Sequence, residues 1–170
     1  MPTEYTHAAA TISPCGLYRY ELVRAWGDPP FCAFVMLNPS TADGAEDDNT
    51  IRRCVGFAQR FGFGGFSVVN LFAFRATKPE AMLAAADPVG PDNDAHILGA
   101  LAAAQRVFAA WGAWDQQKIK DRAWAVRLLA ARVYVPFEAL KLTGKGQPGH
   151  PLYLPAVLDP VPYPHPGADS

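Results

Sequence analysis

Cysteine is scarce in this chain of 170 residues, which has only Cys15, Cys32 and Cys54. They are odd in number and widely spaced, and no two of them form a Cys-x-x-Cys pair. This pattern argues against a disulfide framework, a structural zinc site and a four-cysteine iron–sulfur cluster. The sequence has no other evident cluster of metal ligands, so we expect a protein that works without a metal or cofactor.

Long apolar runs and a strong excess of one charge are also absent. No stretch approaches the roughly 20 apolar residues that a membrane-spanning helix needs, and the N-terminus has no signal-peptide pattern. We therefore expect a cytoplasmic protein with no membrane partner. The formal net charge of −1 excludes a globally basic nucleic-acid binder, although it permits a local basic face.

Hydrophobic residues make up 50% of the chain, enough for one well-buried core. The sequence has no internal repeat and no linker long enough to divide it, so we expect a single α/β domain over residues 13–155. Residues 1–12 are typical of a flexible N-terminal arm. Residues 156–170 form a proline-rich tail, which favours neither a helix nor a central strand.

The most informative stretch is residues 31–43. Residues 31–35 are apolar enough for a strand buried on both faces, and Pro39 then breaks the chain at a defined point. Four polar side chains follow this strand: Asn38, Ser40, Thr41 and Asp43. Ligands bind at the carboxyl ends of strands in open α/β sheets. An ordinary strand-to-helix turn, in which these side chains only cap backbone donors, explains the same residues.

Four strand candidates alternate with helical segments, which predicts a three-layer α/β sandwich with a central parallel four-stranded sheet. We expect these strands near residues 31–37, 66–72, 107–111 and 133–140. Residues 17–24 alternate in polarity and precede a Gly-Asp-Pro-Pro turn, so we expect them to add an antiparallel strand beside residues 31–37. Asp48 or Asn49 can cap a helix that reaches about Phe61 and stops at Gly62.

Polar or aromatic residues also lie at or after the ends of the other predicted strands. Asn70 can read the edge of a planar base with its amide, although a lone Asn also serves to tie down a loop. His150 follows a glycine-rich loop and can donate to a developing anion, although a lone surface His is usually only solvated. Trp111 and Trp114 can stack on a base, although aromatics at such positions are more often core.

Basic side chains are frequent between residues 50 and 79, a segment that contains no acid. If the basic residues surround one crevice, they would suit a phosphate-bearing ligand. Scattered solvated charges are the alternative. The candidates for phosphate binding are Arg52, Arg53, Arg75 and Lys145.

Six different short motifs are spread along the chain: Leu37-Asn38-Pro39-Ser40-Thr41-Ala42-Asp43, Thr50-Ile51-Arg52-Arg53, Val69-Asn70-Leu71-Phe72-Ala73, Asp92-Asn93-Asp94, Ala110-Trp111-Gly112 and Gly149-His150-Pro151-Leu152-Tyr153-Leu154. With these motifs the sequence resembles a bacterial and phage domain family of unknown function over roughly residues 17–155. This resemblance implies a family and no activity.

The order of strand–Leu-Asn-Pro-Ser, strand–Asn-Leu and strand–His-Pro is also similar to the uracil-DNA glycosylase superfamily. That similarity implies a glycosylase-like fold with Asn38 positioning water, Asn70 reading the base, His150 stabilising the leaving anion and Leu152 filling the gap left by a flipped base. The chain departs from the pattern at Met36 and Ser40, which stand where that superfamily has glycines, and after Pro151, where Leu-Tyr replaces Ser-Pro. Phe57 and Phe72 are the candidates for a stacking aromatic.

Three functions fit these observations. The first is a nucleobase-recognising protein that flips a base and hydrolyses its N-glycosidic bond in DNA. The second is a non-catalytic nucleic-acid or nucleotide-binding module, and the third is a small-molecule hydrolase acting on a nucleotide. For the first function we expect Asn38, Asp43 and His150 as catalytic residues, and substrate contacts from Pro39, Ser40, Thr41, Asn70, Phe72, Trp111 and Leu152.

Overall fold

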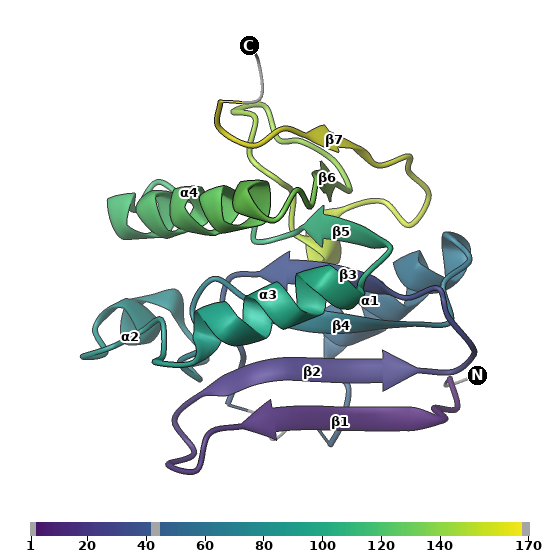
Figure 1. Ribbon diagram of the computed structural model, residues 1–170, viewed down its shortest axis with the longest axis horizontal. Coiled ribbons are helices and arrows are strands. Elements are labelled where there is room, and N and C mark those ends of the chain that lie inside the picture. Colours follow the sequence, from purple (N-terminus) through teal and green to yellow (C-terminus); the bar gives the residue numbers. More distant parts are fainter. Residues whose placement is uncertain (1–2, 42–44, 168–170) are drawn as a thin grey trace.

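The structure, a computed structural model, describes residues 3–41 and 45–167 (Figure 1). In this part of the chain a seven-stranded sheet has the order β1-β2-β4-β3-β5-β6-β7. Its strands are β1 (His7–Ile12), β2 (Arg19–Ala25), β3 (Cys32–Met36), β4 (Gly65–Asn70), β5 (Arg106–Ala109), β6 (Phe137–Ala139) and β7 (Val161–Tyr163). The helices are α1 (Asn49–Arg60), α2 (Pro79–Leu83), α3 (Asn93–Ala103), α4 (Gln117–Arg132) and the 3₁₀ helix η1 (Pro151–Tyr153).

The sheet is mixed, so the predicted fold is wrong. β4, β3, β5 and β6 pair in parallel in that order, whereas β1 with β2, β2 with β4, and β6 with β7 pair antiparallel. We expected a parallel four-stranded sheet with one added strand. Antiparallel strands instead extend both edges, and the outermost of them, β1 and β7, come from the two segments interpreted as an arm and a tail.

The expected pairing of residues 17–24 with residues 31–37 is also wrong, because β4 inserts between β2 and β3. Gly64 and Gly65 make this possible. A Cβ on Gly64 would lie 2.0 Å from the Asp28 carbonyl oxygen, and one on Gly65 would lie 2.7 Å from the Arg24 carbonyl oxygen. The turn after β2 therefore closes around the start of β4, where a side chain would block the approach.

Each predicted strand segment overlaps an observed strand, but β6 covers only part of residues 133–140. The first of these residues instead continue from the end of α4, because the backbone N–H groups of Tyr134 and Val135 donate to the carbonyls of Ala131 and Ala130, respectively. Tyr134 adopts the left-handed conformation with φ of 59°, as is usual for the residue just beyond a helix end.

The predicted helix of residues 50–61 is confirmed. Asp48 caps α1, and its Oδ1 accepts from the Ile51 N–H at 2.8 Å. The apolar face of α1 covers one side of the sheet, where it packs with Phe34 and Phe66. α3 and α4 cover the other side, α3 in front of the sheet in Figure 1 and α1 behind it.

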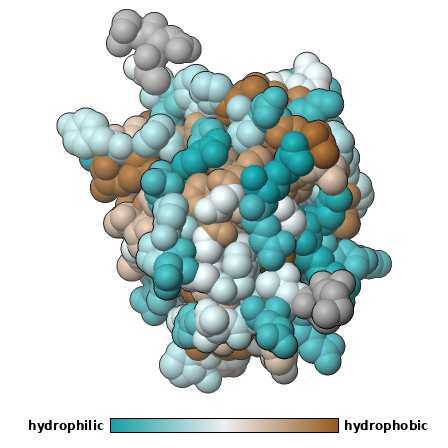
Figure 2. All heavy atoms as spheres, turned by 90° about the vertical axis from the view of Figure 1, so that its right-hand side faces the viewer, coloured by the Kyte–Doolittle hydropathy of each residue, from teal (hydrophilic) through white to brown (hydrophobic). Residues whose placement is uncertain are grey.

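Alternate residues of β3 point into two separate cores, with Phe34 facing α1 and Val35 facing α3 and α4. Figure 2 shows the end of the molecule at which β3 starts, where polar and apolar side chains are interspersed. No helix within the described ranges is long and apolar enough to cross a bilayer.

Candidate functional site

A cavity of about 700 Å³ lies at the carboxyl end of the parallel strands, the end toward which the β3 arrow points in Figure 1. Its wall combines the ends of β3 and β4, the segment after β5, the start of α1 and the segment from Gly149 to Leu154. Asn38, Asn70 and His150 all line it. Three polar residues that are far apart in the sequence thus share one cavity, because parallel strands end at the same edge of the sheet.

Asn70 is the most deeply buried of these three residues. It ends β4 directly beside Met36 of β3, and 3% of its surface is exposed. Its backbone carbonyl accepts from the Asn93 Nδ2 at 2.9 Å, which fixes the end of the strand. Its side-chain amide has no hydrogen-bond partner among the described residues, and because the residue lines the cavity a ligand or water molecule there can pair with it.

Asn38 follows β3, and its amide is fixed in one orientation. Nδ2 donates to the Ala76 carbonyl at 2.9 Å and to the Pro39 carbonyl at 3.1 Å. Pro39 is buried, and its carbonyl also accepts from the Ala76 N–H at 3.1 Å. Because both donors of the amide point at backbone oxygens, Oδ1 is left as an acceptor for the cavity.

His150 lies opposite the start of α1 on the cavity wall. Its Nδ1 accepts from the Leu152 N–H at 3.1 Å, which places the ring proton on Nε2. Burial lowers the pKa of His150, and the negative charge of Asp48 opposes part of that shift. The imidazole is therefore neutral at pH 7 and offers one N–H donor.

η1 presents Leu152 and Tyr153 at the cavity, with 38% and 82% of their surfaces exposed. Arg53 of α1 holds this short helix in place, since its Nε donates to the Pro151 carbonyl at 3.2 Å and its Nη2 donates to the Leu154 carbonyl. A Cβ on Gly149 would lie 2.8 Å from the Leu154 Cδ2 and 3.2 Å from the Lys141 carbonyl oxygen, so a larger residue there would displace the Leu154 side chain.

Trp114 supplies a fixed aromatic ring in the wall. Its indole Nε1 donates to the Trp111 carbonyl at 2.5 Å. The Gln147 amide pairs with both backbone groups of Trp114, accepting from its N–H at 2.8 Å and donating to its carbonyl at 3.2 Å. One hydrogen bond therefore holds the indole, and two more hold the Trp114 backbone that carries it.

A sequence profile of the family described as a protein of unknown function, DUF1643, matches residues 19–152. The chain belongs to this family. Searches of curated proteins and of solved structures found no match. Family membership thus agrees with the first resemblance drawn from the sequence, and it assigns no activity to the cavity.

The basic residues predicted to surround the cavity do not line it. Arg52 is exposed and bonds to Asn49 within α1. Arg53 holds η1, Arg75 donates to the carbonyls of Gly16 and Thr41 at 3.1 and 2.8 Å, and Lys145 lies 3.5 Å from Asp115. Two of the four cations thus donate to backbone carbonyls. No sequence pattern reveals such partners.

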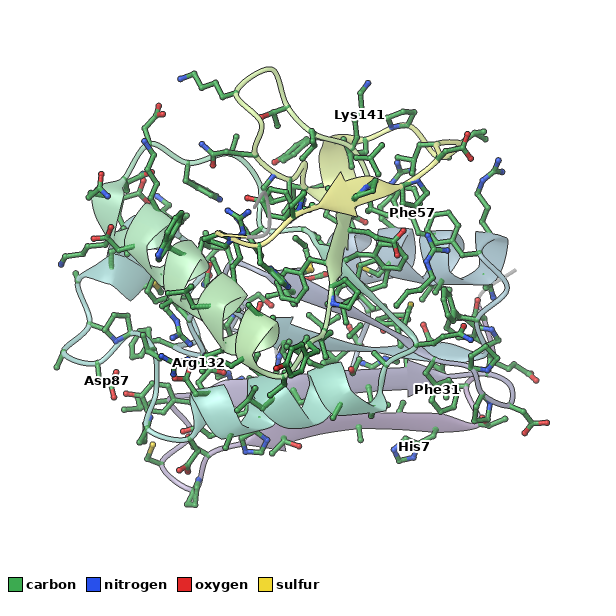
Figure 3. The ribbon with its side chains drawn as sticks, turned by 45° about the horizontal axis from the view of Figure 1, so that its top comes forward. His7, Phe31, Phe57, Asp87, Arg132 and Lys141 are labelled. Carbon is green, nitrogen blue, oxygen red and sulfur yellow. The ribbon has the colours of Figure 1, made fainter. Side chains whose placement is uncertain are left out.

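Several predicted substrate contacts also lie elsewhere. Phe72 and Trp111 are buried in the core on the α3 and α4 side, and Phe57 is buried on α1 (Figure 3). Thr41 is exposed and lies 3.5 Å from the Thr77 hydroxyl, whereas Ser40 and Leu152 do line the cavity. Asp43 lies outside the described residues.

Arg19, Asp48 and Tyr153 also line the cavity, although the sequence did not indicate them as site residues. Arg19 lines the cavity from β2 with 6% of its surface exposed. Asp48 was expected only as a helix cap, and it also forms part of the wall. No group of three or more His, Cys, Asp or Glu side chains lies together as metal ligands within the ranges that the structure describes.

Proposed function

We propose that the cavity binds a nucleobase, carried by a nucleotide or by DNA, and that the protein hydrolyses its N-glycosidic bond. The observation that carries this proposal is Asn70. Its side-chain amide combines a donor and an acceptor at the edge of a cavity of about 700 Å³, within the range of small-molecule sites. Paired donors and acceptors are what the edge of a nucleobase offers.

The flat faces of a base also find partners in the cavity. Trp114 is held rigidly in the wall, and Tyr153 is largely exposed beside His150, with 5.5 Å between the ring centroids of Tyr153 and His150. Stacking on aromatic rings stabilises a base by roughly 1–3 kcal/mol per base. These two residues replace Phe57 and Phe72 as the candidates for the stacking aromatic.

Asn38 and His150 support the hydrolytic part of the proposal. The fixed Oδ1 of Asn38 is suited to accept a hydrogen bond from a water molecule and so to orient it toward the sugar carbon. The neutral His150 is suited to donate from Nε2 to the negative charge that develops on the departing base. Both roles are those that the similarity to the uracil-DNA glycosylase superfamily implies for these residues. The same similarity implies that Leu152 fills the space left by a flipped base.

Calorimetric titration of the full chain with nucleobases and nucleosides tests the binding step. Asn70→Asp retains the shape of the side chain and replaces its donor by an acceptor, so we expect binding to weaken by about 1–3 kcal/mol. Asn49→Asp is the matched control, because Asn49 is exposed on α1 and does not line the cavity. Equal affinities for the wild type and Asn70→Asp would contradict the assignment of the base to Asn70.

Release of free base from nucleotides and oligonucleotides, followed by chromatography, tests the hydrolytic step. We expect Asn38→Ala to abolish release while the ligand still binds, because a group that orients water acts mainly in the transition state. If the wild type binds these compounds but releases no base, the hydrolytic step is contradicted and a non-catalytic binding module is supported.

A further inference from the structure

We propose that the ligand is a free nucleotide with a single phosphate group, and that Arg19 binds this phosphate inside the cavity. This inference rests on the proposed function and adds the class of the substrate. It follows from where the structure places positive charge relative to the cavity.

A nucleic-acid strand would need cations outside the cavity, along the path of its backbone. Arg52, Arg53, Arg75 and Lys145 were the candidates for that role, and each of them already contacts an oxygen atom of the chain itself. Two of the four hold backbone carbonyls of their own chain, which immobilises their guanidinium groups away from a ligand.

Among the described residues of the wall, Arg19 is the one with a cationic side chain. It begins β2, and its backbone N–H donates to the Ala73 carbonyl at 3.0 Å, which places it beside the chain that follows Asn70. Burial lowers the pKa of the guanidinium and Asp48 raises it, but an arginine side chain keeps its charge in proteins. Its planar fork has five N–H donors, so it can bind a phosphate while it retains contacts with the protein.

Asp48 limits how much negative charge the cavity accepts. It is the one acidic side chain among the described residues of the wall, and its Oδ1 is occupied by the Ile51 N–H. A carboxylate repels additional phosphate groups, whereas it accepts hydrogen bonds from the hydroxyl groups of a ribose. One arginine and one carboxylate therefore favour a monophosphate over a triphosphate.

The test compares nucleosides, their 5′-monophosphates, their 5′-triphosphates and a short single-stranded oligonucleotide in calorimetric titrations of the full chain. We expect the monophosphates to bind about tenfold or more tightly than the nucleosides, the size of one charge-assisted contact. Arg19→Gln should remove this difference between monophosphates and nucleosides, and Arg19→Lys should restore part of it. Arg60→Gln, at the exposed end of α1, is the control that should change neither affinity.

Equal affinity for nucleosides and monophosphates, or tighter binding of the oligonucleotide or the triphosphates, would overturn the inference and leave the proposed function standing. Failure of every base-containing compound to bind would overturn both. If Arg19→Gln unfolds, Arg19→Lys is compared with the wild type instead. A direct contact between Arg19 and the phosphate is contradicted if the ratio of monophosphate to nucleoside affinity is the same in both proteins.

Discussion

His150 shows how its surroundings fix the state of a single side chain. The Leu152 N–H occupies Nδ1, burial disfavours the charged ring, and Asp48 partly offsets that effect. As a consequence the folded protein binds a proton at His150 less readily than the unfolded chain does. Between the lowered pKa and the ordinary value of 6.5, the unfolded state therefore holds more protons. The contribution of His150 to stability is complete above pH 6.5 and declines as the pH falls through this window.

The pKa of His150, measured by NMR titration of its ring protons, should therefore lie below 6.5. Asp48→Asn should lower the pKa further, because it removes a nearby negative charge and retains a good helix cap. Asp121→Asn on α4, which lies on an exposed surface bonded to Gln117, should leave it unchanged. A pKa at or above 6.5 in the wild type would contradict the neutral, donating imidazole on which the proposed chemistry depends.

The sequence revealed part of the cavity and not the rest, for a physical reason. Asn38, Asn70 and His150 follow strands, and the ends of parallel strands meet, so their positions along the chain were sufficient to expect them together. Arg19 gave no such signal, because it enters the cavity from the start of an antiparallel strand whose neighbour was predicted wrongly. The function of Arg53 was misread because its partners are backbone oxygens of a distant loop.

Among the elements, η1 depends on α1 for its position. Arg53 carries two hydrogen bonds to η1 and its flank, and its guanidinium lies 5.4 Å from the ring centroid of Phe57. This side chain fixes the segment that contains His150 and Tyr153. Arg53 is therefore a positioning residue for the cavity, without contact to the ligand.

Arg53→Gln should loosen η1 while the sheet stays folded. We expect hydrogen exchange of the Leu152 and Tyr153 amides to accelerate, and the free energy of unfolding to fall by about 1–3 kcal/mol, because two charge-assisted hydrogen bonds are lost. Hydrogen-exchange mass spectrometry and urea unfolding measure the two effects. Arg52→Gln, one position earlier and exposed, is the control. Equal exchange in both variants would show that Arg53 does not hold the segment.

The elements that sequence reasoning missed are those with weak periodicity. β1 contains three consecutive alanines and β7 contains a proline, so neither has the alternation of a typical strand. Both become strands because a neighbour offers unpaired backbone groups, and that is a property of the assembled sheet. β3 and α1, in contrast, have strong apolar patterns and were found at nearly their observed bounds.

For the molecule as a whole, the sheet separates two cores that share the strand β3. Phe34 has no exposed surface and packs at 5.5 Å, between ring centroids, against both Phe66 and Phe108. These contacts join three strands of the sheet under α1. The core on this side therefore depends strongly on one ring.

Phe34→Ala should reduce the free energy of unfolding by about 3–5 kcal/mol, through lost burial and the cavity left behind. This is a large part of the roughly 5–15 kcal/mol that stabilises a typical domain. Leu17→Ala, at a side chain that is 50% exposed, should change it by less than about 0.5 kcal/mol. Urea unfolding of the two variants measures both values, and a cost at Phe34 below that of Leu17 would contradict the assignment of the core.

The prolines of the tail have a consequence for how copies of this protein meet. Pro162 lies in β7, and Pro160 and Pro164 come directly before and after this strand. A proline in an edge strand directs its missing N–H away from the neighbouring strand. That border of the sheet thus lacks N–H donors at three successive positions, which discourages a foreign strand from adding there. β1, at the opposite border, has no proline. In concentrated solution, unwanted strand pairing between molecules should therefore begin at β1, and a charged residue introduced there would be the way to suppress aggregation.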